Sequence, residues 1–232
     1  MPVQGDIEHT TNLLLKKFNA KAVVFDLDGT LIDNNPYHLQ AFLAYLKSLN
    51  RQLSLEEYRQ HINGRTNNDA FRYLFGDALS ADEITTHTNE KEAVYRAIYK
   101  QHINPVAGLI PFLETLKAMN IPMAIATSGI QPNIDFFFEH VPVKDFFTTV
   151  INSTHITQGK PHPEIYLKAA NALNVDPANC LAFEDAVVGV ASAKAAGMQV
   201  IGVLTTEPAL ALQASNGLIT NFLFENFTEL FS

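Results

Sequence analysis

Two carboxylates that follow an apolar run are the residues of this sequence best suited to chemistry. Asp26 and Asp28 come after the run Ala22-Val23-Val24-Phe25, and Gly29 follows them. The run predicts a buried strand, which has no packing reason to end in acids because an unpaired buried charge is costly. Open parallel sheets bind ligands at the carboxyl ends of their strands. The pair therefore suggests a metal site with acid/base chemistry, although Asp-Gly is also a common turn.

Three later segments also place polar groups next to predicted elements. Thr127-Ser128-Gly129 follows one apolar run, Glu184-Asp185 follows another, and Gly159-Lys160-Pro161 puts a lysine just before a predicted helix. Each segment has an ordinary structural interpretation as well. The threonine and the second acid pair can cap helices, and the lysine can be a solvated charge.

Together the four segments resemble the motifs of the haloacid dehalogenase superfamily, whose members are mostly magnesium-dependent phosphatases and phosphomutases. They occur in the family's order, across roughly residues 21 to 205. The resemblance implies an α/β core with a doubly wound, Rossmann-like parallel sheet, and an enzyme that uses Mg²⁺. Tyr37-His38 and the run from Glu184 to Gly189 look closest to the β-phosphoglucomutase-like branch.

The resemblance also implies roles for individual residues. Asp26 is expected to be the nucleophile that forms an aspartyl-phosphate, and Asp28 the general acid and base. We expect Asp28 to protonate more readily than a free carboxyl if it lies out of water near other acids. Asp26, the main-chain carbonyl of Asp28 and Asp185 are expected to bind Mg²⁺, with Glu184 bound directly or through water.

Other core residues are expected to contact the phosphoryl group. The Thr127 hydroxyl and the amides of Ser128 and Gly129 would face a phosphoryl oxygen near a helix start, where anions are favoured. Lys160 would be the counterion of the acids and a phosphate clamp.

The order of predicted elements indicates two domains. Between residues 34 and 104 no strand is evident, and helices are predicted at about 37–50, 54–61, 67–76 and 81–102. Elsewhere, strands at 21–27, 121–127, 148–152, 180–184 and 198–204 alternate with helices at 109–119, 131–139, 163–174 and 187–196. This alternation is typical of a parallel sheet with helices on both faces. We predict an α/β core of residues 1–33 and 105–232, with a short helix at about 6–19, and an inserted all-helical cap domain of residues 34–104.

The cap is expected to close over the site and to select the substrate. The cap residues expected to reach the substrate are His38, Asn63, Arg65 and Asn67. A histidine also occupies the position of His38 in the β-phosphoglucomutases, but their arginine for a second phosphate corresponds to Asn67. We therefore predict a phosphatase for a small phosphorylated metabolite, with a sugar phosphate as the preferred class. A β-phosphoglucomutase-type phosphomutase and a catalytically silent binding protein on the same fold are the alternatives.

Composition restricts the remaining classes. The chain has 232 residues and a formal net charge of −8, which argues against a broad basic surface for nucleic acid. No apolar run approaches the roughly 18 residues of a membrane span. The single cysteine, Cys180, excludes an internal disulfide and favours a reducing, cytoplasmic location. We expect a monomer or a weak homo-oligomer.

Overall fold

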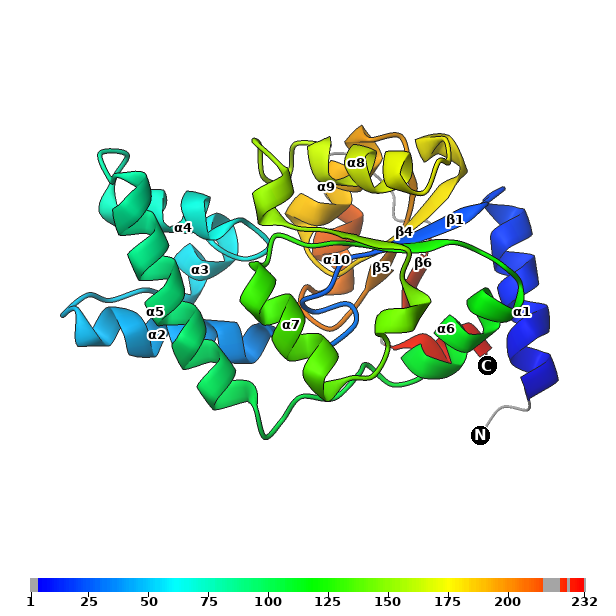
Figure 1. The fold of residues 1–232 in the computed structure, drawn as a ribbon, viewed down its shortest axis with the longest axis horizontal. Helices are drawn as coiled ribbons and strands as arrows, with labels where there is room; N and C mark the ends of the chain where they lie inside the picture. Colours follow the sequence, from blue (N-terminus) through cyan, green and yellow to red (C-terminus); the bar gives the residue numbers. More distant parts are fainter. Residues whose placement is uncertain (1–3, 215–221, 225, 232) are drawn as a thin grey trace.

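A parallel sheet of six strands forms the centre of the protein. The computed structural model describes residues 4–214, 222–224 and 226–231. The strands are β1 (Ala22–Phe25), β2 (Met123–Ala126), β3 (Thr149–Ile151), β4 (Cys180–Glu184), β5 (Gln199–Val203) and β6 (Phe222–Phe224). They pair in the order β3-β2-β1-β4-β5-β6, and every pair is parallel (Figure 1). Because the strand order reverses at β1, a ligand is expected at the carboxyl ends of β1 and its neighbours.

Alternate residues of each central strand pack on opposite faces of the sheet. In β1, Val23 and Phe25 belong to one apolar cluster, whereas Ala22 and Val24 belong to another. The first face is covered by α1 (Gln4–Lys17), α6 (Leu109–Ala118) and α7 (Gln131–His140), and the second by α8 (Glu164–Ala172), α9 (Val187–Ala195) and α10 (Ala209–Ala214) (Figure 1). Short 3-10 helices span Lys144–Phe146, Ser153–His155, Pro177–Asn179 and Phe227–Phe231. The predicted doubly wound α/β fold is confirmed.

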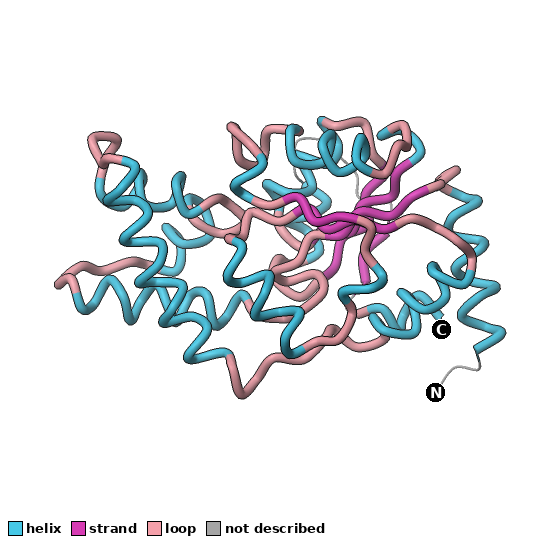
Figure 2. Tube along the Cα trace, viewed as in Figure 1, coloured by secondary structure: helices cyan, strands magenta, loops and turns pink. Residues whose placement is uncertain are grey.

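Residues 35–99 form a helical unit beside the sheet. It consists of α2 (Asn35–Ser48), α3 (Leu55–His61), α4 (Asn67–Phe75) and α5 (Ala81–Tyr99). Figure 2 shows only helices and loops in this unit. It has its own apolar cluster, in which Phe42, Tyr58 and Phe71 are buried.

The chain enters and leaves this unit through two adjacent segments. Ile32 and Pro105 form an antiparallel bridge, and the Val106 amide donates to the Leu31 carbonyl at 2.9 Å. The separate apolar cluster and the paired crossings support the proposed division into a core of residues 1–33 and 105–232 and a cap of residues 34–104. Within that proposed core, positions 1–3, 215–221, 225 and 232 lie outside the described residues.

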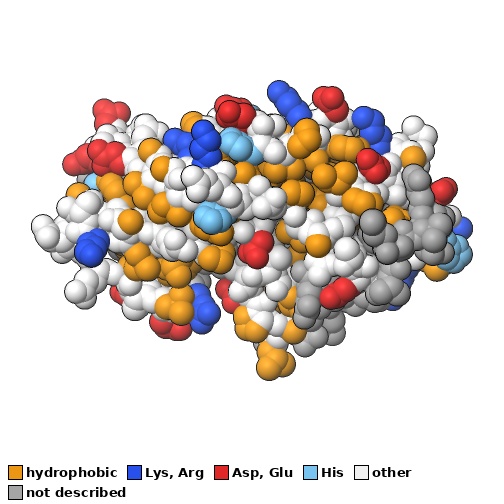
Figure 3. All heavy atoms as spheres, turned by 90° about the horizontal axis from the view of Figure 1, so that it is seen from below, with side chains coloured by type: hydrophobic (Ala, Val, Ile, Leu, Met, Phe, Trp, Pro, Cys, Tyr) orange, Lys and Arg blue, Asp and Glu red, His pale blue; other side chains and the backbone are white. Residues whose placement is uncertain are grey.

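In the part of the chain that the structure describes, no helix is long and apolar enough to cross a membrane. Among the residues coloured by type in Figure 3, lysine and arginine side chains stand apart from one another and form no continuous patch on the face shown.

The aromatic rings that pack on one face of the sheet lead to a stability prediction. Phe183 of β4 is 0% exposed, stacks on Phe25 at 5.1 Å between ring centroids and meets Phe112 edge-on at 5.4 Å. Phe183→Ala should lower the free energy of unfolding by about 3–5 kcal/mol, because the deletion leaves a cavity among these rings. Chemical denaturation measures the loss. Leu167→Ala is the control, since Leu167 is 42% exposed. Equal losses in the two variants would contradict the prediction.

Candidate active site

One cavity at the carboxyl edge of the sheet collects every residue that the sequence analysis selected. It lies between the core and the cap and has a volume of about 60 Å³. The selected residues that line it are Asp26, Asp28, Thr127, Ser128, Gly129, Lys160, Glu184, Asp185, His38, Asn63, Arg65 and Asn67. The core residues meet because β1 lies between β2 and β4, so the ends of these strands share one edge.

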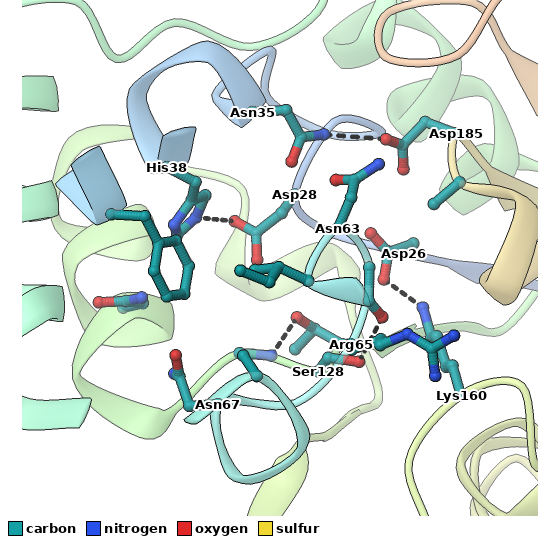
Figure 4. A pocket seen from close by; sticks show the side chains of 18 of the residues that line it. Asp26, Asp28, Asn35, His38, Asn63, Arg65, Asn67, Ser128, Lys160 and Asp185 are labelled. Atoms are coloured by element: carbon teal, nitrogen blue, oxygen red, sulfur yellow. Dashed lines mark hydrogen bonds and ion pairs between the residues drawn. The ribbon is translucent and has the colours of Figure 1, made fainter. Parts of the chain in front are cut away.

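Lys160 lies between the carboxylates that follow β1 and end β4. Its Nζ donates to Asp26 Oδ1 at 2.6 Å and also to Glu184 Oε1, and all three side chains are buried (Figure 4). Burial alone would lower the pKa of Lys160, but the charges of Asp26 and Glu184 outweigh it and raise the pKa. The interpretation of Lys160 as a solvated charge is therefore wrong.

One lysine does not compensate the buried acids. Burial, together with the neighbouring carboxylates, holds the pKa of Asp26 well above its usual value, although Lys160 acts in the opposite direction. Burial and the charge of Glu184 raise the pKa of Asp185 to about 8. The site thus has an excess of negative charge that a bound cation would relieve.

The donor set fits a magnesium ion. Asp26, Glu184 and Asp185 each offer an oxygen, and these atoms lie within 4.8 Å of one another. An all-oxygen set that includes carboxylates is the kind of site that Mg²⁺ prefers.

Glu184 already has a protein donor on every lone-pair position. Its Oε1 accepts from Lys160 and from the Tyr166 hydroxyl at 2.8 Å, and its Oε2 accepts from the amides of Asp185 and Ala186 at 3.0 and 3.1 Å. A carboxylate accepts about four hydrogen bonds. We therefore expect Asp26 and Asp185, rather than Glu184, to supply the direct carboxylate ligands of a metal ion.

Asp28 is held by two residues of the segment that leads into the cap. Its Oδ1 accepts from Asn34 and lies 3.5 Å from His38 Nε2 (Figure 4). On the other side of the ring, Lys91 Nζ contacts His38 Nδ1 at 3.3 Å. Burial would raise the pKa of Asp28, but the contact and charge of His38 and the hydrogen bond from Asn34 lower it overall. The expectation that Asp28 protonates more readily than a free carboxyl is wrong for this reason.

The residues after β2 differ in their freedom to bind a phosphoryl group. The buried Thr127 hydroxyl oxygen accepts from the Gly129 amide at 2.9 Å and keeps its own hydrogen for a further acceptor. The Gly129 amide is therefore not free for a phosphoryl oxygen, contrary to expectation. The Ser128 hydroxyl donates to the Gly64 carbonyl of the cap at 3.1 Å, which ties the two units together.

The cap candidates have different partners. Asn63 donates to Glu207, after β5, at 3.2 Å, and Asn67 donates to Glu92 of α5 at 2.8 Å. Arg65 lines the cavity, and no other described residue forms a hydrogen bond or ion pair with its side chain.

Two adjacent asparagines, at the start of the proposed cap, were missed by the sequence analysis. Asn34 contacts Asp28, and its Oδ1 accepts from the Gly29 amide at 3.0 Å. Asn35 donates to Asp185 Oδ2 at 2.9 Å (Figure 4). Their closeness in sequence to Asp28 was the available signal.

Three further residues of the cavity were also missed. Lys91 and Glu92 of α5 and Asn133 of α7 line it, and each is nearly inaccessible to solvent. For Lys91 a signal existed, because it falls at helical spacing from the buried Tyr95.

Comparison with known proteins places the chain in a family. Residues 23–203 match the model for haloacid dehalogenase-like hydrolases. The chain belongs to this family, and it is an enzyme. The assignment made from the four motifs is confirmed.

Similar proteins include a mutase and a phosphatase. The chain is 31% identical over 203 residues to the β-phosphoglucomutase of Bacillus subtilis, covering 82% of this chain and 86% of that one. It is 31% identical over 184 residues to a phosphorylated carbohydrates phosphatase of Thermotoga maritima, covering 77% and 82%. The crystal structure of a family IA, variant 3 hydrolase from Entamoeba histolytica matches with a TM-score of 0.80 at 32% identity, covering 90% of this chain and 94% of that one.

The contact between His38 and Asp28 leads to a titration prediction. His38→Phe keeps a ring to stack on Tyr95, where the centroids lie 3.7 Å apart, but removes the group that lowers the pKa of Asp28. With burial less opposed, the pKa of Asp28 should rise. Carbon-13 NMR titration of the Asp28 carboxyl in the metal-free protein measures it, with the exposed His9→Phe as control. An unchanged or lower pKa would show that His38 does not hold the carboxylate.

Proposed function

We propose that this chain is a magnesium-dependent phosphatase that hydrolyses a small phosphorylated metabolite, with a sugar phosphate as the preferred class. The observation that carries the proposal is the convergence of Asp26, Lys160 and Asp185 at the carboxyl ends of β1 and β4. The names of the Bacillus and Thermotoga relatives support a phosphorylated sugar.

The proposed reaction has two steps. A carboxylate oxygen of Asp26 attacks phosphorus, the bond from phosphorus to the leaving oxygen breaks, and Asp28 gives that oxygen a proton. Water then attacks the aspartyl-phosphate, and Asp28 takes the water's proton as inorganic phosphate leaves. Lys160 and the Thr127 hydroxyl donate to phosphoryl oxygens. When bound by Asp26, the Asp28 carbonyl and Asp185, Mg²⁺ neutralises phosphoryl charge.

The protonation of Asp28 must change during this cycle. The lowered pKa keeps the free Asp28 carboxyl ionised, the state in which it can accept a proton. As an acid it must first hold a proton, and the negative charge of a bound phosphoryl group raises its pKa in that direction.

We propose that the cap opens to admit the substrate. The cavity of about 60 Å³ is far smaller than the roughly 300–1,000 Å³ of ordinary ligand pockets. Residues 33–36 and 104–108, at the two crossings, are the proposed hinges. Closure would then exclude water from the reacting groups.

A phosphomutase is the second candidate. The identity to the Bacillus mutase and the position of His38 favour it. A mutase would retain its phosphoryl group, and Asn67, which is neutral, stands where the mutases have an arginine for a second phosphate. Measured release of inorganic phosphate during turnover separates the two functions.

We further propose a cytoplasmic location and a monomer or weak homo-oligomer. Support for the location comes from Cys180, which is buried and unpaired, as expected for a protein kept in reducing conditions.

Asp26→Asn tests the covalent step. The amide keeps the shape of the side chain but is a poor nucleophile and a weaker metal ligand, so turnover should fall by at least about 1,000-fold while the circular dichroism spectrum stays the same. The control is Asp145→Asn, at an exposed position. Phosphate release by Asp26→Asn at a tenth of the normal rate would rule out attack by Asp26.

Removal of the metal tests the acidic cluster. A chelator should abolish phosphate release and Mg²⁺ should restore it, whereas Ca²⁺ should inhibit, because it takes more ligands at longer distances. Full activity in the metal-free protein would contradict the proposed site.

Arg65→Ala tests the role of the cap. Loss of a hydrogen bond from Arg65 to the leaving group should cost about 1–3 kcal/mol and lower kcat/KM by about tenfold to a hundredfold for a sugar phosphate. The loss should be much smaller for an aryl phosphate, which offers no hydroxyl group to Arg65. The exposed Arg59→Ala serves as control. Equal losses on both substrates would mean that Arg65 supports the fold or the reacting groups instead.

A further inference from the structure

The cap end of the cavity contains a buried ion pair that the proposed reaction does not use. Lys91 and Glu92 are each 2% exposed, and both line the cavity. Asn67 of α4 and Asn133 of α7 hydrogen-bond to the same glutamate. We call these four residues the Glu92 network.

The charge of Lys91 is not available to a substrate. Its Nζ donates to Glu92 Oε1 at 2.7 Å, contacts His38 Nδ1 at 3.3 Å and lies 4.1 Å from the centre of the Phe42 ring. An ammonium group has three hydrogens, and the three contacts of Lys91 are enough to occupy all of them. Lys91 and Glu92 therefore form a neutral pair rather than a site for an anion.

The Glu92 carboxylate fixes the direction of two amides. Burial would raise its pKa, but the charges of Lys91 and His38 and the hydrogen bonds from Lys91 and Asn133 outweigh it and lower the pKa to about 2. An ionised carboxylate only accepts hydrogen bonds, so both asparagines must turn their NH₂ groups toward it. The distances are 2.8 Å from Asn67 Nδ2 to Oε1 and 2.9 Å from Asn133 Nδ2 to Oε2.

The two amide oxygens then have different partners. Arg96 donates to Asn133 Oδ1 at 2.7 Å, so this oxygen has a donor within the protein. For Asn67, which lines the cavity, no donor to Oδ1 is present among the described residues. Because Nδ2 faces Glu92, the Oδ1 atom on the same amide carbon points away from that carboxylate and can accept a hydrogen bond.

The charged residues that line the cavity also bear on which groups can bind at its cap end. The lining contains five acids, Asp26, Asp28, Glu92, Glu184 and Asp185, and three cations, Arg65, Lys91 and Lys160. Lys91 and Lys160 are paired with carboxylates, so a second phosphate would find only Arg65 as a counterion within this lining. Because Glu92 already compensates the charge of Lys91, this pair offers a second phosphate no net attraction.

We infer that the Glu92 network selects phosphate monoesters with a neutral, hydroxyl-bearing leaving group and discriminates against bisphosphates. This inference rests on the proposed phosphatase function. A substrate hydroxyl can donate to Asn67 Oδ1, whereas a phosphate dianion cannot donate and lies close to a carboxylate. Asn67 is the contacting residue, and Glu92 is a positioning residue that orients it.

The test compares matched substrates. Fructose 1-phosphate against fructose 1,6-bisphosphate, and glucose 6-phosphate against glucose 1,6-bisphosphate, differ by one phosphate, and 4-nitrophenyl phosphate reports on the reacting groups. For the better-hydrolysed monophosphate, kcat/KM should exceed that of its bisphosphate by about a hundredfold, the scale of leaving one buried polar group unpaired.

Variants separate the network from the reacting groups. Asn67→Leu should raise KM for the monophosphate and reduce its kcat/KM about tenfold or more, a larger factor than for 4-nitrophenyl phosphate. Glu92→Gln removes the negative charge, so the ratio of monophosphate to bisphosphate kcat/KM should fall about tenfold. Asn68→Leu, at the exposed neighbouring position, is the matched control and should leave the ratio unchanged.

The outcomes are distinguishable. If Glu92→Gln does not fold because Lys91 is left unpaired, Asn67→Leu still decides through the KM effect. Equal kcat/KM for the monophosphates and bisphosphates, or a ratio and KM that no variant alters, would overturn this inference while 4-nitrophenyl phosphate hydrolysis still upheld the phosphatase. A protein that hydrolyses none of these esters with Mg²⁺ would overturn the proposed function, and the inference with it.

Discussion

Three buried carboxylates share one ammonium group where β1 and β4 end. Lys160 donates to Asp26 and Glu184, and a carboxylate oxygen of Asp185 lies within 4.8 Å of theirs. The surrounding chain is built to tolerate this concentration of charge. At Gly189 a Cβ atom would overlap the Glu184 carboxylate, so only glycine lets that side chain lie against the start of α9. The same constraint applies to Gly29, whose φ is +83° and whose missing side chain leaves room for Asp185.

The parts of this arrangement that follow from local sequence could be predicted. The apolar runs before Asp26, Thr127 and Glu184 read as buried strands because both faces of the sheet are covered, and their ends meet at one edge of a parallel sheet. Four of the five expected strands extended one or two residues beyond the observed ones at each end, as in 121–127 against Met123–Ala126, and 180–184 matches β4. The Thr127 amide still donates to the Ile151 carbonyl of β3 at 2.9 Å, so the hydrogen bonding continues one residue past the strand. No separate elements were assigned after residue 204, where α10 and β6 follow with weak periodicity.

What the sequence could not supply depends on partners that are distant along the chain. His38 and Asn34 set the direction in which the pKa of Asp28 shifts. Their contacts with Asp28 depend on how the chain folds back after β1 as it enters the cap. Asn133 reaches Glu92 because α7 of the core lies against α5 of the cap, and nothing near Asn133 in sequence indicates this. The Gly129 amide looked free for an anion, but the Thr127 hydroxyl oxygen is its nearer acceptor. Side-chain competition of this kind is decided by three-dimensional distances.

The first segment that joins core to cap, residues 33–36, has a consequence for the design of chimaeric proteins with exchanged caps. Asn34 bonds to Asp28 and Asn35 bonds to Asp185, so the peptide that joins core to cap forms part of the wall around the reacting acids. A chimaera that exchanges caps at residue 34 would therefore cut through the inner wall of the cavity, not through a neutral spacer. Residues 34 and 35 should therefore stay with the core when caps are exchanged. A foreign cap joined after residue 35 would leave the hydrogen bonds to Asp28 and Asp185 in place.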